Sequence, residues 1–218
     1  MENFITIKEN VIAEITEKKS KFIANLIKVE NKQDAEEKIN KIKKTYHDAR
    51  HNCVAYRIIE ENKIIEKSSD DGEPSGTAGG PMLNILQKNN LCNILVIVTR
   101  YFGGVLLGTG GLVRAYSKAV QEGLAASKVI LKQKGIALKI TTDYTGLGKI
   151  QYIAGERNIP VLDSEYTDKV VMKLLVPVQD VGSVQKAITE GTNGRAGIEK
   201  DQELYYAVID GKVITFDH

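Results

Sequence analysis

The sequence has no tryptophan, few prolines and no long apolar run, and the lack of such a run excludes a protein that spans a membrane with a helix. No apolar stretch approaches the roughly 20 residues that a helix needs to span a bilayer. The first residues, MENFITIKEN, lack the basic and then apolar layout of a secretory signal peptide. We therefore expect a cytoplasmic protein without a membrane partner.

Cysteine is scarce, and two common nucleotide-binding signatures are missing. Cys53 and Cys92 lie in apolar runs typical of strands, where a free thiol usually acts as a small core residue, so we expect no disulfide. The stretch GGVLLGTGG lacks the spacing of a dinucleotide fingerprint, and no Gly-Lys-Ser/Thr follows it. These absences disfavour a nucleoside-triphosphate enzyme, and we expect no cofactor.

The composition that remains is that of a globular protein with uneven charge. Hydrophobic residues make up 42% and charged residues 27% of the 218 residues, which excludes a mainly disordered or fibrous chain and leaves room for two domains. Residues 1–134 carry 21 Lys and Arg against 16 Asp and Glu, whereas residues 135–218 carry 9 against 12. An anionic partner would therefore meet the N-terminal half, although a charge this small is usually only a solvated surface.

The periodicity of the first 134 residues predicts a mixed β/α domain. In chain order, the patterns predict strands at 11–15 and 19–29, a helix from Asn31 to Tyr46, strands at NCVAYRII and KIIEKS, a helix at PMLNILQKNN, a buried strand at CNILVIVTRYF, and a helix over 112–127. A long polar loop separates KIIEKS from the helix that follows it. We expect this domain to end at residue 134.

The second part of the sequence predicts a ferredoxin-like domain over residues 135–218. Strand, helix, two strands, helix and strand follow one another, which is the βαββαβ order, and KVITF adds a last strand. Lys132 to Gly135 is predicted to be a hinge between the two domains. The fold class is therefore α+β with two domains.

The loop between Ser68 and Pro81 is the first candidate site. Its residues 70–80 combine three carboxylates and two hydroxyls with four glycines, and a loop this long without secondary structure is often functional. Glycine allows the backbone to approach a ligand, and the hydroxyls could donate to phosphate oxygens. The alternative is a surface turn whose side chains cap their own backbone. The candidate residues are Asp70, Asp71, Glu73, Ser75, Gly76 and Thr77.

A second glycine cluster, residues 99–116, lies between a buried strand and a helix. Free N–H groups at a helix start favour an anion, and two arginines flank that point. The alternative is that these glycines only allow close packing of helix and strand. The candidate binding residues are Arg100, Gly103, Gly104, Gly108, Gly110, Gly111 and Arg114.

The segment HDARHNC contains two further candidates, His47 and His51. They suggest a metal site, a proton-transfer or anion contact, or simply a helix end. The helix is expected to end near Tyr46 and a strand to follow, so the two rings need not face one point, and we assign no metal ligand. Cys53 with His51 as a nucleophile pair lacks an evident orienting carboxylate. Lys18 and Lys19 belong to a basic cluster that is usually a solvated strand edge, but that would contact phosphate if the domain binds RNA.

Four motifs in order, KKSKFIA, HDARHNCVAY, DDGEPSGTAGGPML and VTRYFGGVLLGTGGLVRAY, resemble the YigZ/IMPACT family, and the resemblance covers nearly the whole chain. It implies a first domain like those of a small-subunit ribosomal protein and of elongation factor G, and a second like another elongation-factor domain. Eukaryotic members are described as translation regulators that bind the activator of a stress kinase through an extra N-terminal domain. Here the motifs begin within 20 residues of Met1. The resemblance assigns no catalytic residue.

Three hypotheses for the function follow. The leading one is a non-enzymatic module that binds RNA or a ribosome-linked protein of the translation apparatus, through one cleft formed by the two glycine segments with His47 or His51 at its edge. The second is a small hydrolase or transferase in which a histidine is the base and Asp70, Asp71 or Glu73 holds a cation. The third is a protein-interaction adaptor. The oligomeric state stays open.

Overall fold

The chain forms two compact units, which divide between Leu131 and Lys132, close to the boundary expected after residue 134. The structure is a computed structural model that describes residues 3–216. Unit 1 runs to residue 131, and unit 2 begins at residue 132.

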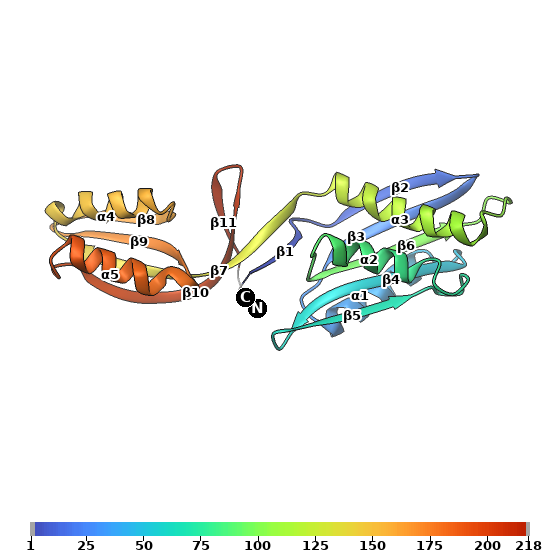
Figure 1. Ribbon diagram of the computed structural model, residues 1–218, viewed down its shortest axis with the longest axis horizontal. Coiled ribbons are helices and arrows are strands. Elements are labelled where there is room, and N and C mark those ends of the chain that lie inside the picture. The colour runs from blue at the N-terminus through green and yellow to red at the C-terminus, as the bar shows by residue number, and fades with distance from the viewer. Residues whose placement is uncertain (1–2, 217–218) are drawn as a thin grey trace. The chain divides into compact units, whose positions relative to one another are not determined.

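Unit 1 is built on a five-stranded antiparallel sheet in the order β2-β3-β6-β4-β5 (Figure 1). The strands are β2 (Val11–Glu17), β3 (Ser20–Lys28), β4 (His51–Glu60), β5 (Lys63–Ser69) and β6 (Ile94–Tyr101). A further strand, β1 (Asn3–Ile7), adds Ile7 to the core. The predicted hairpins β2–β3 and β4–β5 are confirmed, whereas β1 was not predicted.

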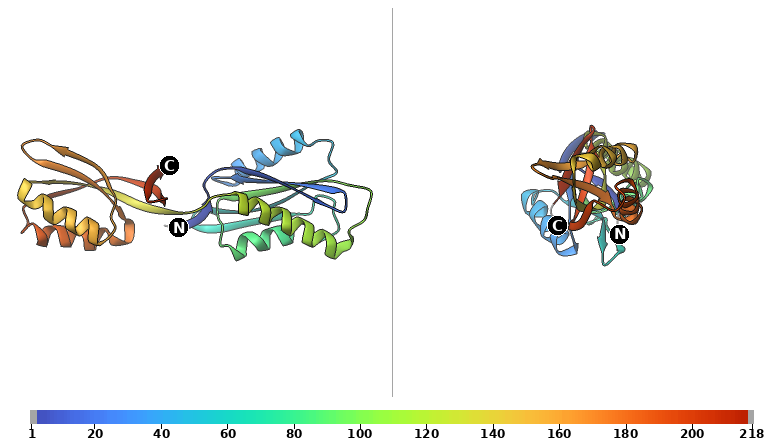
Figure 2. Two further views of the ribbon diagram at one scale, coloured as in Figure 1. Left: turned by 90° about the horizontal axis from the view of Figure 1, so that it is seen from above. Right: turned by 90° about the vertical axis from the view of Figure 1, so that its left-hand side faces the viewer.

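Three helices cover the two faces of this sheet. They are α1 (Lys32–Thr45), α2 (Gly79–Lys88) and α3 (Gly108–Ala126). Figure 2 shows α1 on one side of the sheet and α2 and α3 on the other. α1 begins after its predicted N-cap, because Asn31 Oδ1 accepts a hydrogen bond from the Asp34 N–H at 2.9 Å. No helix within residues 3–216 is long and apolar enough to cross a membrane.

Alternating side chains on the strands supply both cores of unit 1. On β6, Ile94, Val96 and Val98 pack towards α2 and α3, while Leu95 and Ile97 pack towards α1. This apolar burial is the main stabilising contribution to the unit. Beyond Val98 the strand changes to polar residues that are still buried, and the candidate site lies at that end of the sheet.

Unit 2 has the predicted ferredoxin-like arrangement. Its elements are β7 (Val129–Thr142), α4 (Tyr144–Glu156), β8 (Val161–Tyr166), β9 (Val170–Pro177), the short 3-10 helix η1 (Val178–Asp180), α5 (Val181–Gly191), β10 (Gly197–Ile209) and β11 (Lys212–Phe216). The strand order is β11-β10-β7-β9-β8, so the βαββαβ core carries β11 on one edge. α4 and α5 pack on the same face of this sheet (Figure 2).

The predicted hinge at residues 132–135 is wrong, because this segment lies within β7. Gly135 is paired with Leu204 on β10 and with Pro177 on β9. A Cβ added at Gly135 would lie 2.9 Å from side-chain atoms of Leu175 and Tyr206. This glycine therefore leaves room for packed side chains in a strand and does not mark a bend.

Candidate functional site: the polar end of unit 1

The Asp70 side chain holds the first glycine-rich loop together through hydrogen bonds to its backbone. Its carboxylate accepts hydrogen bonds from the backbone N–H groups of Gly76, Ala78 and Gly79 at 2.8, 3.0 and 2.8 Å. Burial alone would raise the pKa of Asp70, but the three donors outweigh it and hold the pKa below its ordinary value of 3.8. Ala78 is the N-cap of α2 and has no side chain that can cap the helix. The Asp70 carboxylate takes this role by accepting the N–H groups of Ala78 and Gly79.

Glu73 and Arg100 form a buried ion pair between this loop and β6. Arg100 Nη1 lies 2.7 Å from Glu73 Oε1, and the two side chains are only 7% and 3% exposed. The Tyr116 hydroxyl on α3 donates to the same oxygen at 2.8 Å. Burial, together with neighbouring Cys53 and Glu73, raises the pKa of Tyr116, so the phenol keeps its proton and remains a donor. A loop, a strand and a helix are therefore joined at one carboxylate.

Asp71 is the third carboxylate of the loop, and it is also paired. Lys43 Nζ lies 2.7 Å from one of its oxygens, and the Asn52 N–H donates to the other at 2.8 Å. Its backbone carbonyl accepts a hydrogen bond from His51 Nδ1 at 3.0 Å. All three acidic groups of the loop thus have internal partners, which reduces their repulsion of an anionic ligand.

The histidines and Cys53 are arranged as structural contacts. His51 lies against the loop, since a Cβ on Gly72 would be 3.4 Å from its Nδ1. The Cys53 thiol donates to the Asp70 carbonyl at 3.0 Å, and burial raises its pKa to about 12, which keeps it protonated at neutral pH. His47 is exposed at the end of α1, with Nδ1 3.3 Å from the Lys44 carbonyl oxygen. Within residues 3–216 no three His, Cys, Asp or Glu side chains are grouped to hold a metal ion.

The remaining candidates in the loop are divided between internal and exposed positions. Thr77 is buried, and its hydroxyl donates to the Pro74 carbonyl at 2.6 Å. Ser75 and Gly76 are exposed. The hydroxyl of Thr77 therefore closes a turn, and Ser75 is the hydroxyl that faces solvent.

The second glycine segment also has both packing and open positions. Gly103 lies against the β2–β3 turn so closely that an added Cβ would overlap the backbone of Lys19, and its N–H donates to Ser20 Oγ at 3.2 Å. Gly104 and Gly108 have positive φ values and open space around them. Gly110 and Gly111 belong to the first turn of α3. Gly103 therefore allows close packing, but against a turn and not between a helix and a strand.

A basic surface lies beside this segment, at the start of α3. We define it as Lys18 and Lys19 of the β2–β3 turn with Arg114 and Lys118 of α3, all exposed. The ion pairs among the described residues of unit 1 use other cations, namely Lys21, Lys38, Lys43, Arg57, Lys67 and Arg100.

A pocket of about 200 Å³ opens within the basic surface. Its lining is Glu17, Lys18, Leu107, Gly111, Arg114, Ala115 and Lys118. The N-cap of α3 has no capping side chain, and the first turn holds no acidic residue. This pocket contains no residue of the 70–80 loop, so the single cleft between the two glycine segments stays a prediction.

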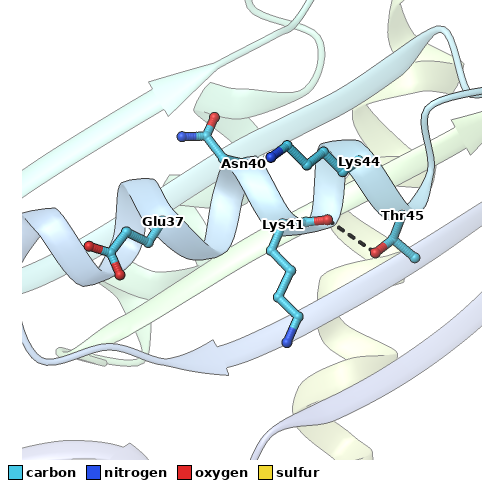
Figure 3. Close-up of a pocket in the computed structure, with 5 residues that line it drawn as sticks. All are labelled: Glu37, Asn40, Lys41, Lys44 and Thr45. Carbon is cyan, nitrogen blue, oxygen red and sulfur yellow. Dashed lines mark hydrogen bonds between the residues drawn. The ribbon is translucent and has the colours of Figure 1, made fainter.

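Another pocket, of about 520 Å³, lies along α1 and was not predicted (Figure 3). Its lining is Glu37, Asn40, Lys41, Lys44 and Thr45, all from one helix. The Thr45 hydroxyl donates to the Lys41 carbonyl at 3.0 Å. The charges are mixed, and the pocket provides a useful control for the basic surface.

Arg100, one of the predicted ligand-binding residues, is buried and already ion-paired. Its charge is used by Glu73, and its guanidinium lies between the rings of Phe22 and Phe102. Ser20, Tyr116 and Phe102, which also contact residues at this end of the sheet, were not among the predicted site residues. Tyr116 fits the apolar stripe of α3, so nothing in the pattern indicated that its hydroxyl meets Glu73.

The comparisons with known proteins agree with both units. The Impact N-terminal domain matches residues 18–124, and a domain of unknown function, DUF1949, matches residues 140–195. The chain is 43% identical to the IMPACT family member YvyE of Bacillus subtilis, over 94% of each chain. It is 32% identical to the IMPACT family member YigZ of Escherichia coli, over 84% of this chain and 90% of that one.

A solved structure resembles this chain over both units. A crystal structure described as that of a hypothetical protein is 29% identical, covers 93% of this chain and 98% of its own, and has a TM-score of 0.59. The fold, the two domain matches and the relatives together place this chain in the IMPACT family, which confirms the resemblance of its four motifs.

Proposed function

We propose that unit 1 binds RNA through its basic surface and that the protein acts on the translation apparatus. The observation that carries this proposal is the internal pairing of all three loop carboxylates. Unpaired carboxylates in this loop would argue against RNA binding, because they would repel phosphates. With Asp70, Asp71 and Glu73 occupied, the exposed charge next to the α3 pocket is predominantly basic.

The chemistry of the basic surface suits a polyanion. Three flexible lysines and an arginine can follow a phosphate backbone, and release of counterions from the RNA then favours association. The fold resemblance to ribosomal-protein and elongation-factor domains supports the same partner by analogy. Arg100 is excluded from the contact set, because moving it to a phosphate would leave Glu73 buried and unpaired.

Fluorescence anisotropy with a single-stranded RNA of about 12 nucleotides, a length within the usual span of such sites, tests the proposal. Over about 50 to 200 mM salt, the affinity should fall steeply, and the double variant Arg114→Ala/Lys118→Ala should bind more weakly. The slope of log K against log salt should decrease by about 0.7 for each lost phosphate contact.

The matched control is Lys41→Ala/Lys44→Ala, which removes the same charge from α1 of the same unit (Figure 3). It should bind like the parent. Association that does not depend on salt, or an equal loss in both double variants, would contradict a specific role for the basic surface. Both variants should melt at the parent's temperature, which shows that the fold is intact.

A further inference from the structure

An ordered stack of side chains runs from the core of unit 1 to its surface. The rings of Tyr116 and Phe22 meet edge to face, with centroids 5.2 Å apart and planes at 87°. The guanidinium carbon of Arg100 lies 5.5 Å from the Phe22 ring centroid and 5.6 Å from that of Phe102. Phe22 is fully buried, whereas Phe102 is 51% exposed. The stack therefore ends in an aromatic ring that meets solvent.

The contacts below Phe102 hold its ring in position. Arg100 is fixed by the Glu73 carboxylate at 2.7 Å, with Ser20 Oγ 3.4 Å from its Nη2. Gly103, the residue after Phe102, donates its N–H to the same Ser20 oxygen at 3.2 Å and lies against the β2–β3 turn. A cation held over the face of an aromatic ring attracts it. The exposed ring is thus held in place before a ligand arrives, which reduces the conformational entropy lost on binding.

Cationic side chains belong to the segments next to this ring. Lys19 belongs to the turn that Gly103 touches, and neighbouring Lys18 lines the α3 pocket together with Arg114 and Lys118. An exposed aromatic ring beside a basic track is the combination that binds single-stranded nucleic acid, in which unpaired bases stack and phosphates meet cations. A duplex keeps its bases stacked on one another and does not offer a base to this ring.

We infer that Phe102 is a stacking platform for an unpaired nucleobase of single-stranded RNA whose phosphates contact the basic surface. This inference rests on the proposed RNA binding and specifies its substrate class. Arg100 is a positioning residue, because it orients Phe102 and does not touch the RNA. Glu73 acts one step further away by fixing Arg100.

The test uses the full chain and a single-stranded RNA that carries one 2-aminopurine. Its fluorescence should be quenched when the base stacks on Phe102, and the quenching should disappear in Phe102→Leu. The affinity of Phe102→Leu should fall about 5- to 150-fold, which corresponds to the loss of one stacked base. Phe102→Tyr should keep both the affinity and the quenching, and the salt slope should be unchanged in both variants because no cation is lost.

Leu106→Ala is the matched control, since Leu106 belongs to the same loop and is 81% exposed. It should bind RNA like the parent. Equal losses in Phe102→Leu and Leu106→Ala would indicate a general apolar surface of the kind that docks a protein, and would overturn the inference. An RNA with an abasic site at the probe position tests stacking without any variant, and it should bind more weakly to the parent.

The outcomes distinguish a failure of the stacking platform from a failure of the proposed RNA binding. If the parent does not bind RNA at low salt, both fail. If Arg114→Ala/Lys118→Ala weakens binding but Phe102→Leu retains full affinity and quenching, RNA binding stands and the stacking platform is wrong.

Discussion

Glu73 shows how one side chain decides the structure of the polar end. A carboxylate and a guanidinium removed from water lose several kcal/mol of hydration each, and only close pairing with further hydrogen bonds compensates for that loss. Here Tyr116 supplies one additional hydrogen bond to the carboxylate. The pair thus ties the loop to β6 and α3 with a geometry that loose surface charges do not have.

Replacing Glu73 should be costly. Glu73→Gln leaves the Arg100 charge buried without its counter-ion, and we expect the free energy of unfolding to fall by about 3 kcal/mol. The control is Glu14→Gln, which breaks the surface pair of Glu14 with Lys21 and should cost less than about 1 kcal/mol. Urea denaturation measures both, and equal small effects would show that the buried pair contributes little.

Asp70 should make the stability depend on pH. A carboxyl whose pKa is lower in the folded than in the unfolded chain stabilises the fold above its unfolded pKa, and this contribution is lost as the pH falls through the folded pKa. Asp70→Asn should therefore destabilise the protein at neutral pH. The difference from the parent should shrink once the pH drops below 3.8, the ordinary pKa. A difference that stays constant from neutral to acidic pH would argue against the three N–H contacts.

The elements were largely predictable because their signals are local. Alternation identified β2 and β3, a continuous apolar run identified β6, and the N-cap Asn31 identified the start of α1. Pairing between distant residues has no such signal, so Lys43 as the partner of Asp71 and Tyr116 as a partner of Glu73 were not predicted. Gly135 was predicted to lie in a hinge but lies in β7. In sequence, a strand glycine that makes room for Leu175 and Tyr206 cannot be distinguished from a hinge glycine.

The glycines of the two loops differ in what surrounds them, and this difference can be measured. Gly103→Ala would force its Cβ into the backbone of Lys19, so we expect a loss of about 3 kcal/mol as the turn is displaced. Gly80→Ala lies in the first turn of α2 with open space around it and should raise stability by up to about 1 kcal/mol, because alanine favours a helix. Thermal melts of the two variants should shift in opposite directions. A tolerated Gly103→Ala would mean that the β2–β3 turn yields easily.

At the scale of the whole chain, each unit has its own buried core. The clusters that pack α1, α2 and α3 lie in residues 3–131, and those that pack α4 and α5 lie beyond residue 132. A domain with its own core can usually fold alone. Separately expressed fragments 1–131 and 132–218 should each unfold in a single cooperative transition, measured by circular dichroism. An unfolded fragment would show that the boundary is misplaced or that the units depend on each other.

Ultraviolet cross-linking of the full chain to single-stranded RNA, followed by mass spectrometry of the linked peptides, tests the central claim most directly. If unit 1 binds RNA as proposed, the cross-links should fall in the peptides that contain Lys18, Lys19, Phe102 and Arg114. Addition of salt should reduce them, since the contact depends on phosphates. Cross-links confined to α1 or to unit 2, or none above the level of an unrelated protein, would contradict it.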